Sequence, residues 1–155
     1  MAEATGTDRI SIDNVESWVR SMGCKSSRTT TPETNWILEI EYPINSTHRI
    51  NVINTKQQPL AIGIVTGVAL AQEFTDAYGK LSSAAQKEFR WELVKTLGNG
   101  DTEFNLKETS DGRPQGFEIM ATRYWDGLSL DAFARSMFSV YKTEIVAINC
   151  VRRFL

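Results

Sequence analysis

Residues 36–69, WILEIEYPINSTHRINVINTKQQPLAIGIVTGVA, alternate apolar and polar side chains and then become almost wholly apolar. The period of two in residues 36–42 predicts a strand with one buried face, which ends at Pro43. After a turn, residues 49–54 predict a second strand. Residues 60–69 predict a third strand that is covered on both faces, as in the centre of a sheet. Because these strands follow one another directly, they predict antiparallel pairing.

Apolar side chains at helical spacing predict three helices, each preceded by a serine that can cap it. The helices cover about residues 11–22, 82–97 and 130–151, and a short helical turn covers residues 71–80. Gly23 favours a left-handed end for the first helix. The end of the last helix stays open, because residues 144–151, EIVAINCV, also fit a strand.

Two further strands are predicted between the second and third helices, at residues 102–107 and 117–125. Phe104 and Leu106 are expected to face inward. The polar stretch at residues 24–34, CKSSRTTTPET, is interpreted as a loop. The predicted order α-β-β-β-α-β-β-α indicates an α+β fold, in which helices pack on an antiparallel five-stranded sheet.

The composition indicates one folded domain. The chain has 155 residues, of which 41% are hydrophobic and 23% are charged, and its net charge is −2. A disordered chain would contain fewer apolar residues and carry more net charge. A chain of this length buries about two thirds of its unfolded surface, which suffices for one core. Residues 10–155 are therefore predicted to form a single domain after a flexible N-terminus at residues 1–9.

Charge and cysteine content bear on the compartment and the partners. The chain has two cysteines, Cys24 and Cys150, and no run of 18 apolar residues. Its first residues lack the basic and apolar regions of a secretory signal. These features predict a cytoplasmic protein without a membrane span. The 19 acidic residues outnumber the 17 basic ones, which disfavours nucleic acid as a partner, because such binding depends on neutralising phosphates.

Few residues are candidates for catalysis. His48 is the only histidine, and neither a serine-nucleophile motif nor a phosphate-binding loop occurs. Cys24 and Cys150 lie too far apart in the sequence to suggest a metal site. Glu39 and Glu41 share a strand face and are interpreted either as a carboxylate pair or as exposed acids beside basic neighbours. We therefore predict no enzymatic activity, no cofactor and no bound metal.

A helical wheel of residues 82–97 places Trp91 opposite the apolar face of the helix. Lys87, Val94 and Lys95 flank it. A large aromatic side chain framed by basic stems is typical of an anchor at a protein interface. The alternative is that Trp91 packs beneath a loop of its own chain. These four residues are the predicted interface candidates.

Glu144 is the second unusual position, because it falls within the apolar stripe of the last helix. An uncompensated buried carboxylate is costly. Three interpretations stay open: the side chain pairs with a basic group, the helix changes phase or the carboxylate reaches solvent, or the residue lines a small pocket. Glu144 is therefore the pocket candidate of the sequence.

Several short motifs occur in a recognisable order. Ile50-Asn51-Val52-Ile53 lies in a strand, Leu81-Ser82 opens a helix, Phe89-Arg90-Trp91 lies within that helix, and Asp126-Gly127-Leu128 precedes the last helix. Over about residues 10–150 the chain resembles a family of small uncharacterised proteins, found chiefly in archaea and described as a domain of unknown function. Where that family reads Leu-Ser-Pro-Glu, this chain reads Leu-Ser-Ser-Ala, which removes a rigid first turn.

The order of elements is also similar to the type III secretion chaperone-like fold, which a bacterial sensory-regulator family shares. This resemblance implies a cytoplasmic α+β homodimer that binds other proteins, and it transfers no catalytic residue. The first functional hypothesis is thus a non-enzymatic homodimeric protein-binding module, chaperone-like or regulatory, with an unidentified protein client. The alternative is a small-molecule-binding or enzymatic domain, with a pocket between the sheet and the C-terminal helix that contains Glu144.

Overall fold

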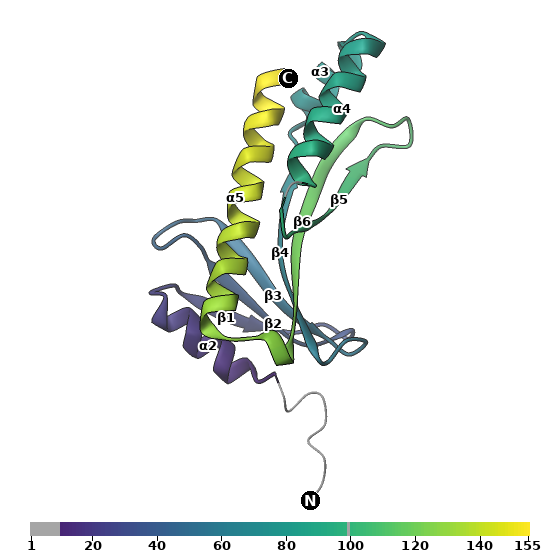
Figure 1. Cartoon of the computed structure of the whole chain (residues 1–155). Coiled ribbons are helices and arrows are strands. Elements are labelled where there is room, and N and C mark those ends of the chain that lie inside the picture. Colours follow the sequence, from purple (N-terminus) through teal and green to yellow (C-terminus); the bar gives the residue numbers. More distant parts are fainter. Residues whose placement is uncertain (1–9, 99) are drawn as a thin grey trace, which may run out of the picture. The chain divides into compact units, whose positions relative to one another are not determined.

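The computed structural model describes residues 10–98 and 100–155, so the predicted flexible N-terminus at residues 1–9 lies outside the described residues. In chain order the elements are α2 (Ile12–Ser21), β1 (Ser26–Thr29), β2 (Thr34–Glu41), β3 (Arg49–Thr55), β4 (Ala61–Ala69), α3 (Gln72–Lys80), α4 (Ser83–Leu97), β5 (Glu103–Glu108), β6 (Pro114–Tyr124), the 3-10 helix η1 (Trp125–Gly127) and α5 (Leu130–Phe154) (Figure 1). Across the described part of the chain, no helix combines the length and apolar character that a membrane span requires.

The strands form one antiparallel sheet in the order β1-β2-β3-β4-β6-β5. This arrangement confirms the predicted α+β class and the antiparallel sheet. β4 lies between β3 and β6, which agrees with the central position predicted from its apolar run. β1 and β5 form the two edges of the sheet.

The prediction of five strands is wrong, because the sheet has six. The additional strand, β1, lies within residues 24–34, for which the sequence predicts a loop. It pairs with β2 from Ser26↔Ile40 to Thr29↔Ile37. Three of its four residues are exposed, so it has no buried apolar face that a period of two would reveal.

Two boundaries in the C-terminal half also differ from prediction. α5 continues to Phe154, so the alternative strand at residues 144–151 is wrong. β6 begins at Pro114, earlier than the predicted residue 117. The hairpin is tighter than the predicted loop, because Thr109 N–H donates to Arg113 O at 2.8 Å.

The chain divides into two compact units. Unit 1 comprises the described residues up to Val65 together with Ala121–Met137, and unit 2 comprises Thr66–Met120 and Phe138–Leu155. β4, β6 and α5 each contribute residues to both units. The single domain over residues 10–155 stays a prediction.

The core of unit 1 is organised by β2, whose residues alternate between buried and half-buried along the whole strand. Leu38 pairs with Val52 of β3, and Ile40 pairs with Ile50. All four side chains are fully buried, and burial of such a side chain contributes about 1.5–3 kcal/mol. The predicted alternation in this strand is confirmed.

α2 begins and ends as the sequence predicts. Ser11 accepts a hydrogen bond from the Asp13 N–H at 3.1 Å and so caps the helix. Gly23 follows the helix with a φ of +77°, a conformation that glycine adopts without a Cβ penalty. Val15 and Val19 of α2 are buried, and α2 contacts β2.

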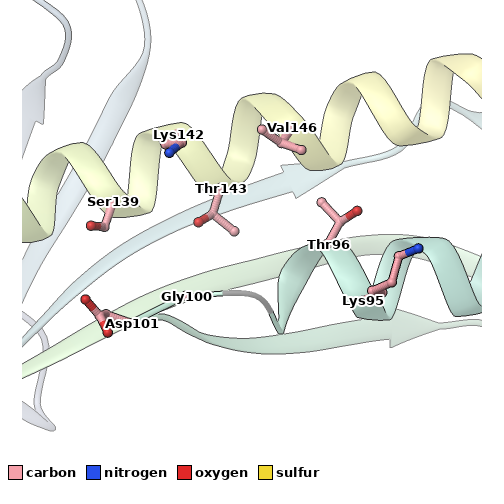
Figure 2. Close-up of a pocket in the computed structure, with 8 residues that line it drawn as sticks. All are labelled: Lys95, Thr96, Gly100, Asp101, Ser139, Lys142, Thr143 and Val146. Atoms are coloured by element: carbon pink, nitrogen blue, oxygen red, sulfur yellow. The ribbon is translucent and has the colours of Figure 1, made fainter.

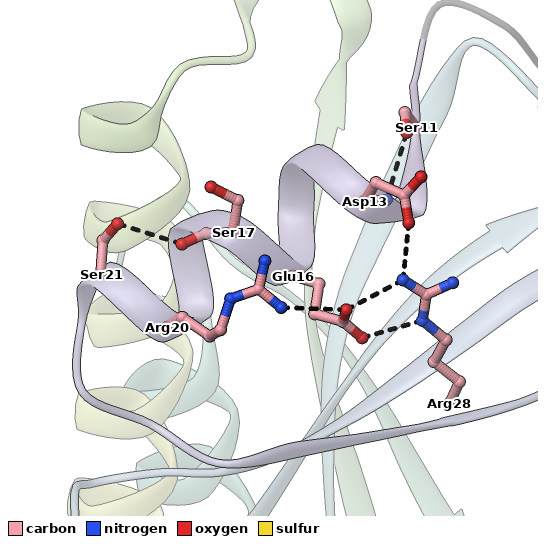
Figure 3. A network of polar contacts seen from close by, with 7 residues as sticks. All are labelled: Ser11, Asp13, Glu16, Ser17, Arg20, Ser21 and Arg28. Atoms are coloured by element: carbon pink, nitrogen blue, oxygen red, sulfur yellow. Dashed lines mark hydrogen bonds and ion pairs between the residues drawn. The ribbon is translucent and has the colours of Figure 1, made fainter.

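Arg28 joins the edge strand β1 to α2 within unit 1 (Figure 3). Its Nη2 lies 2.6 Å from Asp13 Oδ1, and its Nε lies 2.8 Å from Glu16 Oε2. Arg20 also contacts Glu16, at 3.2 Å. The hydrogen bond from Arg28 holds the pKa of the Glu16 carboxyl below its ordinary value, because it stabilises the charged form.

This lowered pKa predicts a specific pH dependence of stability. A carboxyl whose pKa is lowered by folding stabilises the protein above its unfolded pKa, about 4.3 for glutamate, and this contribution is lost as pH falls further. We expect the urea midpoint of wild type to fall more steeply between about pH 5 and pH 3 than that of Glu16→Gln. Glu33→Gln, at an exposed turn position, serves as the control. Parallel curves for wild type and Glu16→Gln would contradict the prediction.

Unit 2 has its own apolar core around α4. Phe89, Leu93 and Leu97 are fully buried along one face of this helix. The Phe89 ring packs at 5.7 Å from the ring of Tyr78 on α3 and at 5.9 Å from that of Phe154 on α5. Both pairs are edge-on, which is a favoured aromatic geometry. α4 is therefore held on one side, and its other side carries the predicted interface residues.

Candidate functional site

Trp91 lies on the face of α4 opposite the buried side chains, as the helical wheel predicts. It is 66% exposed, which is unusual for a tryptophan in a folded protein. No described part of the chain covers it, so the alternative that a loop shields Trp91 is wrong for the described residues.

Val94 and Phe104 extend the exposed surface beside Trp91. Trp91, Val94 and Gly98 are spaced by three and four residues, so they form one strip along α4. A methyl group on Gly98 would lie 3.7 Å from the Phe104 ring, which places this ring at the end of the strip. Val94 is 38% exposed and Phe104 is 37% exposed. We call Trp91, Val94 and Phe104 the α4–β5 patch.

Phe104 reaches the patch because β5 is the edge strand. Phe104 pairs with Ile119 of β6, and Leu106 pairs with Phe117. Side chains directly opposite each other share a face of the sheet, and both residues on β6 are buried. Phe104 therefore lies on the inward face, as predicted. Its ring is nevertheless exposed, because no described strand lies beyond β5.

The basic residues that flank the patch differ in their partners. Lys87 is exposed. Lys95 Nζ lies 2.9 Å from Glu92 Oε1, on the same helix. Arg90 Nη1 lies 2.5 Å from Glu108 Oε1 and so joins α4 to β5. The surroundings of the patch thus combine both signs of charge, which suits contact with a protein better than contact with a polyanion.

Glu144 is 4% exposed and belongs to the buried stripe of α5. Thr66 Oγ1, on β4, donates a hydrogen bond to Glu144 Oε2 at 3.0 Å. The interpretations that the helix changes phase or that the carboxylate reaches solvent are therefore wrong. A hydrogen bond to a buried carboxylate offsets part of its desolvation cost. The sequence could not identify this donor, because Thr66 and Glu144 are 78 residues apart.

A cavity of about 370 Å³ lies between α4 and α5 in unit 2 (Figure 2). Its walls are about equally polar and apolar, and the polar part consists of hydroxyl and amino groups together with the Asp101 carboxylate. The lining residues are Lys95, Thr96, Gly100, Asp101, Ser139, Lys142, Thr143 and Val146. Its volume is within the range of small-molecule sites. Glu144 does not line this cavity, so the predicted pocket candidate lies outside it.

The other polar candidates are engaged in local contacts within unit 1. His48 Nδ1 donates to Tyr42 O at 2.7 Å. Arg49 Nε lies 3.4 Å from Glu39 Oε1, and Arg49 Nη2 lies 3.1 Å from Glu41 Oε1. The two acids are thus paired with a basic neighbour on β3, which is the second of the two interpretations. These contacts position side chains of the sheet and its turn.

The two cysteines are free thiols. Burial raises the pKa of Cys24, and burial together with the neighbouring Glu92 raises the pKa of Cys150. A raised pKa keeps a thiol protonated near neutral pH, where it is a weak nucleophile. Within residues 10–98 and 100–155, no group of three or more histidine, cysteine and acidic side chains is placed to hold a metal ion.

α5 carries exposed apolar side chains that the sequence analysis did not single out. Phe138, Ile145 and Val146 are all exposed, and their spacing of seven and eight residues puts them on one face of the helix. A helical wheel extended to the outer face of α5 would have found them. The exposed apolar surface of unit 2 is therefore larger than the sequence analysis indicated.

Fold and patch together define the chain as an α+β protein with an exposed apolar surface on its second unit. It belongs to the family DUF2299, described as an uncharacterised conserved protein, whose profile matches residues 11–151. The comparison with curated proteins found no match.

Two solved structures are similar to the chain. The crystal structure of an uncharacterised protein from Methanothermobacter thermautotrophicus has a TM-score of 0.85 at 20% sequence identity and covers 94% of this chain and 100% of its own. That likeness supports the fold alone. YbjN from E. coli has a TM-score of 0.49 at 11% identity, over 93% of this chain and 91% of its own.

The contact between β4 and α5 predicts a cost for losing the Thr66 hydroxyl. Thr66→Val keeps the shape of the side chain but removes the donor to Glu144. We expect the free energy of unfolding to fall by about 1–3 kcal/mol, measured by urea denaturation. Thr66→Ser keeps the donor and is expected to lose less. A valine variant as stable as wild type would show that this hydrogen bond does not support Glu144.

Proposed function

We propose that the chain is a non-enzymatic protein-binding module, chaperone-like or regulatory, that works as a homodimer in the cytoplasm. The observation that carries this proposal is the α4–β5 patch, in which Trp91, Val94 and Phe104 are exposed together. Contiguous large apolar side chains on the surface of a folded protein mark interaction sites. The occupant that we propose for the patch is a second copy of the chain.

Trp91 is the side chain on which this interface would depend most. Tryptophan is enriched among the residues that dominate binding energies, because its ring buries a large apolar area. The ion pair of Arg90 with Glu108 links α4 to β5, so Trp91 and Phe104 are presented by connected regular elements. A surface that is already ordered loses less entropy when it binds.

Two further observations support the proposed compartment and assembly. Cys24 and Cys150 are free, and free thiols are typical of a reducing compartment such as the cytoplasm. The order of elements resembles that of the type III secretion chaperone-like fold, which implies a homodimer. This argument is an analogy of fold and involves no site residue.

The proposal predicts that Trp91→Ala weakens self-association. Truncating a tryptophan that is buried at an interface is expected to cost about 2 kcal/mol or more, which is roughly a thirtyfold increase in the dimer dissociation constant. Sedimentation velocity over a range of concentrations measures this change. Phe138→Ala removes another exposed aromatic ring, on α5, and is the matched control, which is expected to dimerise as wild type does.

A wild-type protein that sediments as a monomer at every concentration would overturn the proposed homodimer. A dimer that Trp91→Ala leaves unchanged would remove the patch from the interface. Circular dichroism of both variants establishes that neither change unfolds the chain.

The cavity between α4 and α5 favours small-molecule binding as a second candidate function. Lys142 and the hydroxyls of Ser139 and Thr143 line it, and amino and hydroxyl donors suit the oxygen atoms of phosphates and carboxylates. Under this candidate, millimolar orthophosphate or succinate raises the melting temperature of wild type but not that of Lys142→Ala. Unchanged melting temperatures in wild type would count against it.

A further inference from the structure

β5 has one unpaired side. Its residues, EFNLKE, pair with β6 on one side, and β5 is the last strand in the order of the sheet. Five of its six residues are exposed. Among the described residues, no backbone hydrogen bond connects the outer side of β5 to another segment. An open edge of this kind is a template on which another strand can pair.

The sequence of β5 is complementary to itself when two copies run antiparallel. With Asn105 opposite Asn105 of the partner subunit, Glu103 faces Lys107 of the partner subunit and Phe104 faces Leu106 of the partner subunit. Each relation occurs twice, because the two-fold axis repeats it. Opposite charges and apolar pairs directly opposite each other both stabilise antiparallel strands. No other centre within the strand gives both kinds of match.

The apolar pairs and the charged pairs lie on opposite faces of β5. Phe104 and Leu106 point to the inward face, because they oppose buried residues of β6. Glu103, Asn105 and Lys107 alternate with them and lie on the other face. Pairing of two β5 strands therefore joins the apolar side chains on the face that carries the α4–β5 patch and the charged pairs on the opposite face.

The charges select a second copy over an unrelated strand. Charged side chains on an edge strand normally oppose pairing, and an apolar partner strand would leave Glu103 and Lys107 without matching charges. A second copy supplies the matching charge at both positions. Lys107 lies 2.8 Å from Glu118 in the single chain, with both side chains well exposed. An exposed ion pair contributes little to stability. Lys107 can therefore also pair with Glu103 of the partner subunit at little cost.

We propose that two copies of the chain join by antiparallel pairing of their β5 edges, centred on Asn105, which continues the sheet from one copy into the other. This inference rests on the proposed homodimer and specifies its geometry. The Phe104 rings then lie at the centre of the interface, and the Trp91 and Val94 side chains on each α4 border it.

Charge reversal tests the pairing. Glu103→Lys and Lys107→Glu each place like charges opposite one another at two positions, so each variant alone is expected to dimerise about tenfold or more weakly. In an equimolar mixture the two variants restore both opposite-charge pairs, and heterodimers with the wild-type dissociation constant are expected. Sedimentation velocity measures the dissociation constant of each variant alone and of the equimolar mixture. Restored association on mixing also shows that the variants are folded.

Matched reversals at exposed positions of unit 1, Glu33→Lys and Lys56→Glu, change the net charge equally. They are expected to dimerise as wild type does, alone and mixed. Equal dimerisation of all the variants, or single-variant losses that mixing does not repair, would overturn the β5 pairing.

A cysteine at the two-fold axis tests the register. Opposed residues of antiparallel strands have Cα atoms about 4.5–5.5 Å apart, which is within the range of a disulfide. Asn105→Cys is therefore expected to form a covalent dimer on mild oxidation. Lys107→Cys places its two thiols about 14 Å apart along the strands and is expected to stay uncrosslinked, as is wild type with its own Cys24 and Cys150.

The outcomes separate the two proposals. A monomeric wild type overturns the homodimer and, with it, the pairing of β5. A dimer that weakens with Trp91→Ala but tolerates charge reversal and does not crosslink through Asn105→Cys keeps the patch as the interface and overturns the β5 geometry. Crosslinking together with rescue on mixing supports both.

Discussion

The alternation of buried residues in β2 is the constraint on which unit 1 depends. Leu38 and Ile40 face Val52 and Ile50 across the β2–β3 ladder, and a slip of one residue would turn both β2 side chains toward the other face. Since α2 contacts this same strand, such a slip would also remove the surface that its apolar stripe covers. The register of one strand pair therefore determines the surface on which the helix packs.

Much of this fold could be predicted from local sequence signals. The serine cap of α2, the positive φ of Gly23 and the alternation in β2 each depend on neighbouring residues, and each was predicted correctly. β1 escaped prediction because an exposed four-residue strand has no buried face and is defined only by its pairing with Ile37–Ile40. Periodic apolar patterns in a sequence indicate buried faces, and edge strands such as β1 have few buried residues.

The candidate site was predictable to a similar extent. The exposure of Trp91 and Val94 follows from one helical wheel, because the two residues are close in sequence. Phe104 joins them only because β6 lies between β4 and β5, and this strand order cannot be read from residues in sequence. The conflict at Glu144 was visible in the sequence, but its donor Thr66 lies on another element. Long-range pairing thus limits what one sequence reveals about a site.

The two edges of the sheet differ in a way that bears on the size of any assembly. β1 is only four residues long, and its Arg28 side chain is held by two carboxylates of α2, whereas β5 is longer and its outer side is open. A sheet with two open edges can add copies without limit and grow into a fibre. If β5 pairs with a second copy as proposed and the short β1 does not pair, growth would end after the first addition. β1, the short strand that local sequence patterns do not predict, would then limit the assembly to two copies.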